Sequence, residues 1–292
     1  MGKVTNTWSL MGASWEILKK DKEMIIFPVL SSIACLIVMA SFAYPIYMTG
    51  QWRPPAANAP SADEFSFYLA LFLFYFCNYF VIVFFNAGIV ACATIRIEGG
   101  DPTVLDGLKA ASNRVAPIVG WALLLSTVGL ILRLIGRRAS RGGRIVAGLL
   151  GVSWSIASFL VVPILVVEGK GPFAALSESV SLLKKSWGEQ LVGNFSFGLV
   201  FFLLSLPAFL VIGLAVYAGV GYLTIFFAIL AGEYLVALSV VQSTLHSIFQ
   251  AAVYSHVRSG TESGRSQLDD IRDALQLYAI KNDAKTGVEK LA

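Results

Sequence analysis

The chain has 292 residues and a formal net charge of +4; 57% of its residues are apolar and only 14% are charged. Because a soluble globular protein carries about 25% charged residues, a water-soluble single domain is excluded, and the mild charge makes no case for binding nucleic acid. The apolar residues lie in blocks of about 20 or more, the length that crosses a hydrocarbon core roughly 30 Å thick. Backbone amides in lipid are paired only within helices or closed barrels, and barrel strands would show as short alternating segments. We therefore predict an all-α polytopic membrane protein.

Six apolar blocks follow one another and predict a bundle of about six transmembrane helices. Their approximate bounds are 24–48, 66–95, 115–135, 145–167, 190–216 and 221–257. The first block is longer than the apolar core of a signal peptide, about 7–15 residues, so we expect it to stay as a membrane anchor. The last block is too long for one crossing, so we expect its helix to tilt or to protrude into the cytoplasm.

A short amphipathic segment precedes the first, third and fifth blocks, and each is expected to lie flat in the cytoplasmic interface before the chain turns into the membrane. Glu98-Gly99-x-x-x-Pro102 recurs as Glu168-Gly169-x-x-x-Pro172, and the pattern of residues 14–20 recurs at 179–185. We interpret the chain as three copies of one unit, an interfacial helix followed by a transmembrane hairpin, with approximate bounds 1–99, 100–169 and 170–260. Residues 1–260 then form one transmembrane domain, and residues 261–292 form a cytoplasmic tail with one short amphipathic helix.

The basic residues predict the orientation. With both termini in the cytoplasm, the inner segments hold 16 Lys and Arg and the outer segments hold 6, the bias that the positive-inside rule favours. An arginine cluster breaks this rule if blocks three and four cross the membrane; a shallow re-entrant hairpin is the alternative. The cluster comprises Arg133, Arg137, Arg138, Arg141 and Arg144. Its candidate roles are contact with anionic lipid headgroups, the mouth of an anion pathway, or plain interfacial anchoring.

Several motifs outside this cluster are less easily matched by chance. They are Val167-Glu168-Gly169, Pro172-Phe173-x-Ala175-Leu176-x-x-Ser179, Leu182-Leu183-Lys184-Lys185-x-Trp187-Gly188 and Ile248-Phe249-Gln250-Ala251-Ala252-x-Tyr254. They resemble an uncharacterised prokaryotic family of six-helix integral membrane proteins over roughly 90–260. More distantly, the layout is similar to the membrane domain attached to some glycerophosphodiester phosphodiesterases. The resemblance implies a multi-pass fold in the inner membrane of a bacterium or archaeon, and it brings no activity and no functional residue.

Catalytic motifs are absent from the sequence. It holds no His-Glu-x-x-His, no Gly-x-Ser-x-Gly and no P-loop, and its only histidines are His246 and His256. A site with three histidine ligands is therefore excluded. We expect neither an enzyme nor a bound cofactor or metal.

The last block carries the strongest polar pattern. Polar side chains recur there at steps of three and four, on one stripe formed by Ser239, Gln242, Ser243, His246, Gln250 and Tyr254. In lipid such a stripe turns toward other helices or toward water. Two interpretations stay open: hydrogen bonding between helices, and the wall of a hydrated path.

Glu233 stands apart from the stripe. It lies about 18 Å from the turn at Gly221 by helical rise, near the middle of the bilayer. We expect it to face inward, either neutral and hydrogen-bonded to Asn78, Asn86 or Asn194, or paired with Arg133, or serving as a proton or cation site. These residues suggest a permeation or transport component for a small solute or ion. The alternative is a non-transporting scaffold that organises lipids or partner proteins, or assembles with copies of itself.

Overall fold

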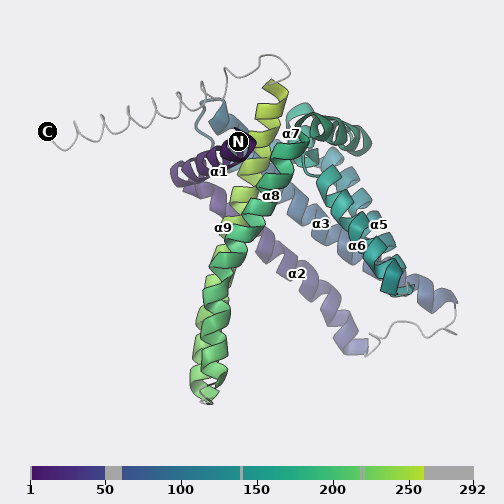
Figure 1. The fold of residues 1–292 in the computed structure, drawn as a ribbon. Helices are drawn as coiled ribbons and strands as arrows, with labels where there is room; N and C mark the ends of the chain where they lie inside the picture. Colours follow the sequence, from purple (N-terminus) through teal and green to yellow (C-terminus); the bar gives the residue numbers. More distant parts are fainter. Residues whose placement is uncertain (1, 50–60, 139–140, 218, 220, 260–292) are drawn as a thin grey trace.

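The computed structural model describes residues 2–49, 61–138, 141–217, 219 and 221–259, and every element in these ranges is helical (Figure 1). Within this part of the chain, six segments are long and apolar enough to cross a membrane. They are Lys22–Pro45, Phe65–Ile97, Val115–Gly136, Ile145–Glu168, Gly198–Tyr217 and Gly221–Ser259. The all-α fold and the six apolar segments are as predicted, and the protein is a multi-pass membrane protein.

The helices follow the apolar pattern along the chain. In order they are α1 (Gly2–Lys20), η1 (Lys22–Ile25), α2 (Ile26–Thr49), α3 (Ser61–Ile97), α4 (Val104–Asn113), α5 (Val115–Arg138), α6 (Arg141–Ala157), α7 (Val161–Glu168), α8 (Pro172–Tyr217) and α9 (Gly221–Ser259). Helices α1, α4 and α7 gather at one end of the molecule, together with the end of α9 (Figure 1). We call this the joined end, and the opposite end the spread end.

At the spread end the helices move apart. Helices α8 and α9 pack against each other as a long antiparallel pair, and their turn lies well away from the far ends of α2, α5 and α6 (Figure 1). Apolar side chains are exposed along this pair, among them Phe202, Leu210, Phe226 and Val236. In a bilayer such side chains are covered by lipid or by another protein.

The hydrophobic core lies at the joined end. Phe27, Trp121, Ile164 and Phe249, from four different segments, are at most 2% exposed and belong to one cluster. The packing is tight enough to require glycine: a Cβ built on Gly107 would lie 2.5 Å from the Phe27 ring and 2.8 Å from a backbone oxygen. The joined end is therefore closed by the chain's own side chains.

Two predicted segments differ from their expected form. The third amphipathic segment is not a separate helix, because α8 runs from Pro172 to Tyr217 without a break. No proline lies between its amphipathic and apolar parts, and the glycines there, Gly188 and Gly193, are too weak as helix breakers to end it. Conversely, the fourth apolar block is not one helix but α6 and α7, separated at residues 158–160.

The repeat of three units stays a prediction, and so do the interfacial positions of α1 and α4. The two Glu-Gly-x-x-x-Pro segments do share one local feature. Gly99 and Gly169 follow helix ends with φ of 87° and 66°, the left-handed region that favours glycine. The predicted amphipathic helix of the tail lies outside the described residues.

Candidate functional site

The polar stripe on α9 passes from the buried part of the helix to its exposed part. At the joined end Gln250 is buried and His246 is half-buried. Nearer the turn, Gln242 is half-buried whereas Ser239 and Ser243 are exposed. One chain therefore does not enclose the whole stripe, and a continuous hydrated path along it stays a prediction.

The buried part of the stripe packs against α7's N-terminal side. The Phe159 ring meets the His246 ring edge-on with centroids 5.8 Å apart, and Gln250 Nε2 lies 3.4 Å from His246 Nε2. Gln250 Oε1 is buried and has no hydrogen-bond partner among the described residues. Because buried amide oxygens are nearly always hydrogen-bonded, this oxygen can accept from a donor that reaches the joined end.

The break in the fourth span lies beside this pair. Helix α6 ends at Ala157, and the Ser179 hydroxyl of α8 donates to the Ala157 carbonyl at 2.6 Å and accepts from the Leu160 amide at 3.2 Å. Non-helical backbone at membrane depth is tolerated only where its polar groups are satisfied, so Ser179 allows the break. In the sequence, Pro163 indicates this break, because its nitrogen cannot donate to the carbonyl of Phe159 and its ring disfavours a continuous helix there.

Glu233 faces away from the rest of the described chain. Its side chain is exposed, although it lies 12 residues into α9. The inward position predicted for it is not found within a single chain. Toward its turn the α8–α9 pair lies apart from the other helices (Figure 1). A charged carboxylate in lipid costs about 2.5–3.5 kcal/mol at mid-bilayer on the insertion scale, so this position favours a covering partner or the neutral form.

The residues expected to meet Glu233 bind elsewhere. Arg133 donates to the Tyr75 hydroxyl, and its guanidinium carbon lies 5.8 Å from the centre of that ring. Asn78 donates to the Phe74 carbonyl at 2.8 Å. Asn86 Oδ1 is buried without a hydrogen-bond partner among the described residues, and the Asn194 side chain lies outside them.

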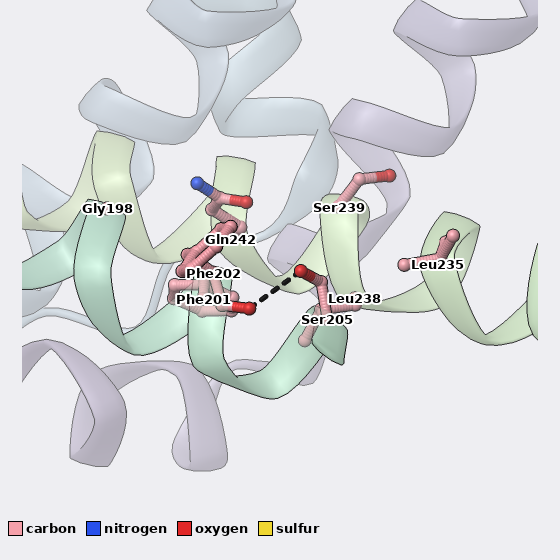
Figure 2. Close-up of a pocket in the computed structure, with 8 residues that line it drawn as sticks. All are labelled: Gly198, Phe201, Phe202, Ser205, Leu235, Leu238, Ser239 and Gln242. Carbon is pink, nitrogen blue, oxygen red and sulfur yellow. Dashed lines mark hydrogen bonds between the residues drawn. The ribbon is translucent and has the colours of Figure 1, made fainter. Parts of the chain in front are cut away.

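A hollow of about 320 Å³ lies between α8 and α9 (Figure 2). It belongs to the part of the pair that is nearer to the turn between the two helices, which we call the distal half. Its polar members are Ser205, Ser239 and Gln242, and its apolar wall is formed by Gly198, Phe201, Phe202, Leu235 and Leu238. The Ser205 hydroxyl donates to the Phe202 carbonyl at 2.7 Å, and the Ser239 hydroxyl to the Val236 carbonyl at 2.8 Å. The hydroxyl oxygens and the Gln242 amide give the hollow hydrogen-bonding groups on an apolar wall. Ser205 was not singled out from the sequence, because it lies alone in an apolar stretch.

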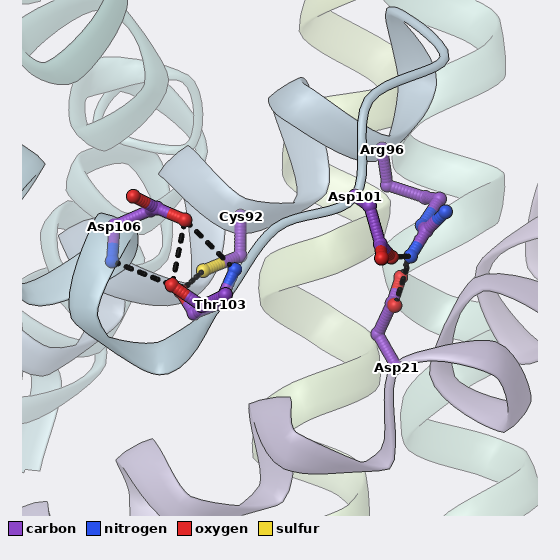
Figure 3. A network of polar contacts seen from close by, with 6 residues as sticks. All are labelled: Asp21, Cys92, Arg96, Asp101, Thr103 and Asp106. Atoms are coloured by element: carbon purple, nitrogen blue, oxygen red, sulfur yellow. Dashed lines mark hydrogen bonds and ion pairs between the residues drawn. The ribbon is translucent and has the colours of Figure 1, made fainter.

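An ion-pair network ties the first hairpin together at the joined end (Figure 3). Arg96, near the end of α3, binds both Asp21 and Asp101, and the Arg96 and Asp21 side chains are only 9% and 7% exposed. Next to it, Thr103 and Asp106 form a capping box at the start of α4. Hydrogen bonds from Thr103 hold the pKa of the exposed Asp106 carboxyl below its usual value, because they favour the charged form.

A second network joins α7 to the end of α9. The Glu168 side chain, 7% exposed, forms ion pairs with Lys170 at 2.6 Å and with Arg258, and it accepts a hydrogen bond from the Tyr254 hydroxyl. Arg114 donates to the Val166 carbonyl at 3.2 Å. Glu168 is the C-terminal residue of α7, where the helix dipole disfavours a negative charge, and Lys170 and Arg258 compensate that charge. Both networks hold helix ends in place.

The arginine cluster lies around the α5–α6 connection. Arg133 is described above, and the side chains of Arg137, Arg138, Arg141 and Arg144 lie outside the described residues. Lipid contact or an anion pathway at this cluster therefore stays a prediction. Within the described ranges, no group of three or more His, Cys, Asp and Glu side chains is placed to hold a metal ion.

Comparison with known protein families gives a match. The model of DUF6159, a family of unknown function, matches residues 65–265, which is more than half of the chain. No curated protein matches the chain. The resemblance to an uncharacterised membrane family is thus supported over a wider range than 90–260, and the more distant similarity to glycerophosphodiester phosphodiesterases stays a prediction.

Proposed function

The chain belongs to the DUF6159 family, a family of unknown function, and we propose that it is a membrane scaffold that associates laterally with other membrane proteins. The observation that carries this proposal is the exposed Glu233 on the distal half of α9. A polar face at that depth is stable only if another surface covers it or if its carboxyl group stays neutral. In this proposal the protein is not an enzyme, and both termini lie in the cytoplasm of a prokaryotic cell.

The division of the molecule supports a scaffold. The joined end is closed and held by two ion-pair networks, which makes it a rigid base. The α8–α9 pair extends from this base and exposes its apolar and polar side chains. A rigid base with a projecting, uncovered helix pair suits a protein that positions partners in the plane of the membrane.

A photo-crosslinking amino acid at Ala237, one turn from Glu233 on the same side of α9, tests this function in native membranes. We expect discrete protein adducts that disappear with Glu233→Leu and persist with the control Glu98→Leu, which removes an exposed carboxyl group at the joined end. Adducts to lipid alone, or protein adducts indifferent to both changes, would overturn the scaffold.

Transport of a small solute or ion is the second candidate. Two observations favour it: the broken fourth span, which in transporters accompanies substrate sites, and the buried Gln250 Oε1 beside His246. Purified protein in liposomes separates the two functions. Flux that is lost with Gln250→Leu and kept with Glu98→Leu supports transport, and the absence of flux across a broad panel of solutes and ions contradicts it.

A further inference from the structure

One side of α9 is uncovered on the distal half of the helix. It carries Glu233 together with exposed apolar neighbours at helical spacing, and we call it the outer face of α9: Phe226, Ile229, Glu233, Val236 and Ala237. Gly232 lies beside Glu233, and a Cβ built there would meet no atom within 4 Å. Glycine lowers helix stability relative to alanine, and the chain's own packing does not require it here. A small residue at such a place lets another helix approach closely.

The chain itself offers hydrogen-bonding groups at the depth of Glu233. Ser205 lies 12 residues before the end of α8, and Glu233 lies 12 residues after the start of α9. Both are therefore about 18 Å from the turn by helical rise. A direct contact confirms this register, since the Tyr234 hydroxyl donates to the Leu204 carbonyl at 2.7 Å. Copies of one membrane protein insert with the same orientation, so Glu233 of one copy and Ser205, at the edge of the hollow of another copy, lie at equal depth. Ser239 and Gln242 lie 18 and 21 residues after the start of α9, about 27 Å and 32 Å from the turn.

The hollow has the chemistry that a carboxyl group needs. At the depth of Glu233, the Ser205 hydroxyl can turn from the Phe202 carbonyl of its own helix toward an acceptor. The apolar wall of Phe201 and Leu238 suits the aliphatic neighbours of Glu233. Gly198, which also borders the hollow, leaves open space for an approaching helix.

The outer face of α9 and the α8–α9 hollow cannot contact each other within one chain. A two-fold axis that pairs the same surface of two copies does not bring them together either. Glu233 and Gln242 are nine residues apart, or two and a half helical turns, so they point to opposite sides of α9. A contact between the outer face of one copy and the hollow of the next is head-to-tail. Such contacts form a closed ring when the rotation between copies closes.

We propose that the outer face of α9 docks into the α8–α9 hollow of a second copy, with Glu233 hydrogen-bonded to Ser205 of that copy. This inference rests on the scaffold function proposed above and names the partner as the chain itself. The successive contacts build a ring in the membrane, and the joined ends form its base. The ring covers the carboxyl group that a single chain leaves exposed.

Disulfide crosslinking between two differently tagged copies tests the contact in native membranes. The background carries Cys35→Ala, Cys77→Ala and Cys92→Ala. One copy has Ala237→Cys and the other Phe202→Cys, positions that lie about 24 Å and 22 Å from the turn. The control pair combines Ala237→Cys with Ile37→Cys on the exposed side of α2.

We expect the 237–202 pair to crosslink at least tenfold more than the 237–37 pair. Glu233→Leu in the Ala237→Cys copy lowers that yield at least fivefold, whereas Glu233→Gln, which keeps a hydrogen-bonding group, retains at least half of it. Equal yields for both pairs, indifference to Glu233→Leu, or stronger crosslinking of Ala237→Cys with itself would each overturn the proposal.

The outcome also separates this inference from the scaffold function. If a photo-crosslinker at Ala237 captures a different membrane protein in a Glu233-dependent way while the 237–202 pair stays unlinked, the second copy is wrong as the partner and the scaffold stands. If the photo-crosslinker finds only lipid, both fail.

Discussion

The two halves of α9 belong to one apolar helix and have opposite surroundings. From Thr244 to Tyr254 the helix is almost entirely buried among α1, α3, α7 and α8, whereas between Gly221 and Ser243 most side chains are exposed. Both halves carry polar groups on an apolar helix. The difference shows that sequence periodicity places residues on a face, and that only the neighbouring helices decide whether the face is covered.

This comparison divides the polar residues by role. Ser179 lies where the chain supplies its own packing, and its hydrogen bonds belong to the fold. Glu233 lies where the chain supplies none, so we infer that it acts between molecules. Changes at the joined end should therefore destabilise the folded chain, and matched changes on the distal half should leave it folded.

The largest expected difference concerns two phenylalanines of α9. Phe249 is 1% exposed in the core and Phe226 is 60% exposed on the outer face. Phe249→Ala should lower the free energy of unfolding by about 3–5 kcal/mol, because it removes a buried ring and leaves a cavity. Phe226→Ala should change it by less than about 0.5 kcal/mol. Unfolding in mild detergent measures both, and equal losses would contradict the division.

The buried ion pair should come next. Asp21→Asn leaves Arg96, which is 9% exposed, with only the exposed Asp101. We expect a loss of about 3 kcal/mol, because an incompletely paired charge stays buried. The matched control is Glu16→Gln, which breaks the exposed pair with Lys19 and should cost less than about 1 kcal/mol. A small effect of Asp21→Asn would show that the network does not hold the joined end.

Two serines that bind backbone groups give a smaller contrast. Ser179→Ala strands the Ala157 carbonyl and the Leu160 amide at the break, and it should cost about 1–3 kcal/mol. Ser205 binds only a carbonyl of its own helix, so Ser205→Ala should leave the chain folded as before. Thermal unfolding of both variants in detergent measures the difference, and a neutral Ser179→Ala would mean that other groups satisfy the break.

The smallest effect is a pH dependence at the start of α4. Because the pKa of Asp106 is lowered in the folded chain, its capping box contributes stability above the usual carboxyl pKa, about 3.9. That contribution is lost as the pH falls through the lowered value. Carboxyl NMR of the full chain should show the Asp106 pKa rising toward its usual value in Thr103→Val and staying low in Thr103→Ser. An unchanged pKa in Thr103→Val would rule out the Thr103 hydroxyl as the cause.

Length and composition were sufficient to predict the six spans. The third block was expected at 115–135, and the structure has Val115–Gly136. The break at residues 158–160 was missed, because the apolar content of the fourth block does not fall there. Pro163 alone indicated it, and the partner that satisfies the break, Ser179, lies 19 residues beyond Leu160.

The candidate site was harder to predict than the spans. Helical spacing placed Glu233 near mid-membrane depth and identified the stripe on α9, and these positions follow from rise and rotation alone. Whether the Glu233 side chain is buried or exposed depends on where α8 and α9 separate from the other helices. That separation is set by packing between segments far apart in the sequence. For the same reason the hollow around Ser205 was not visible in the sequence.

The central claim is that another copy of the chain covers the outer face of α9. Native mass spectrometry of the protein released from lipid nanodiscs tests it most directly, by comparing the unchanged chain with Glu233→Leu. We predict a closed oligomer of one defined size for the unchanged chain and folded monomers for Glu233→Leu. Monomers in both samples, or the same oligomer in both, would contradict the claim.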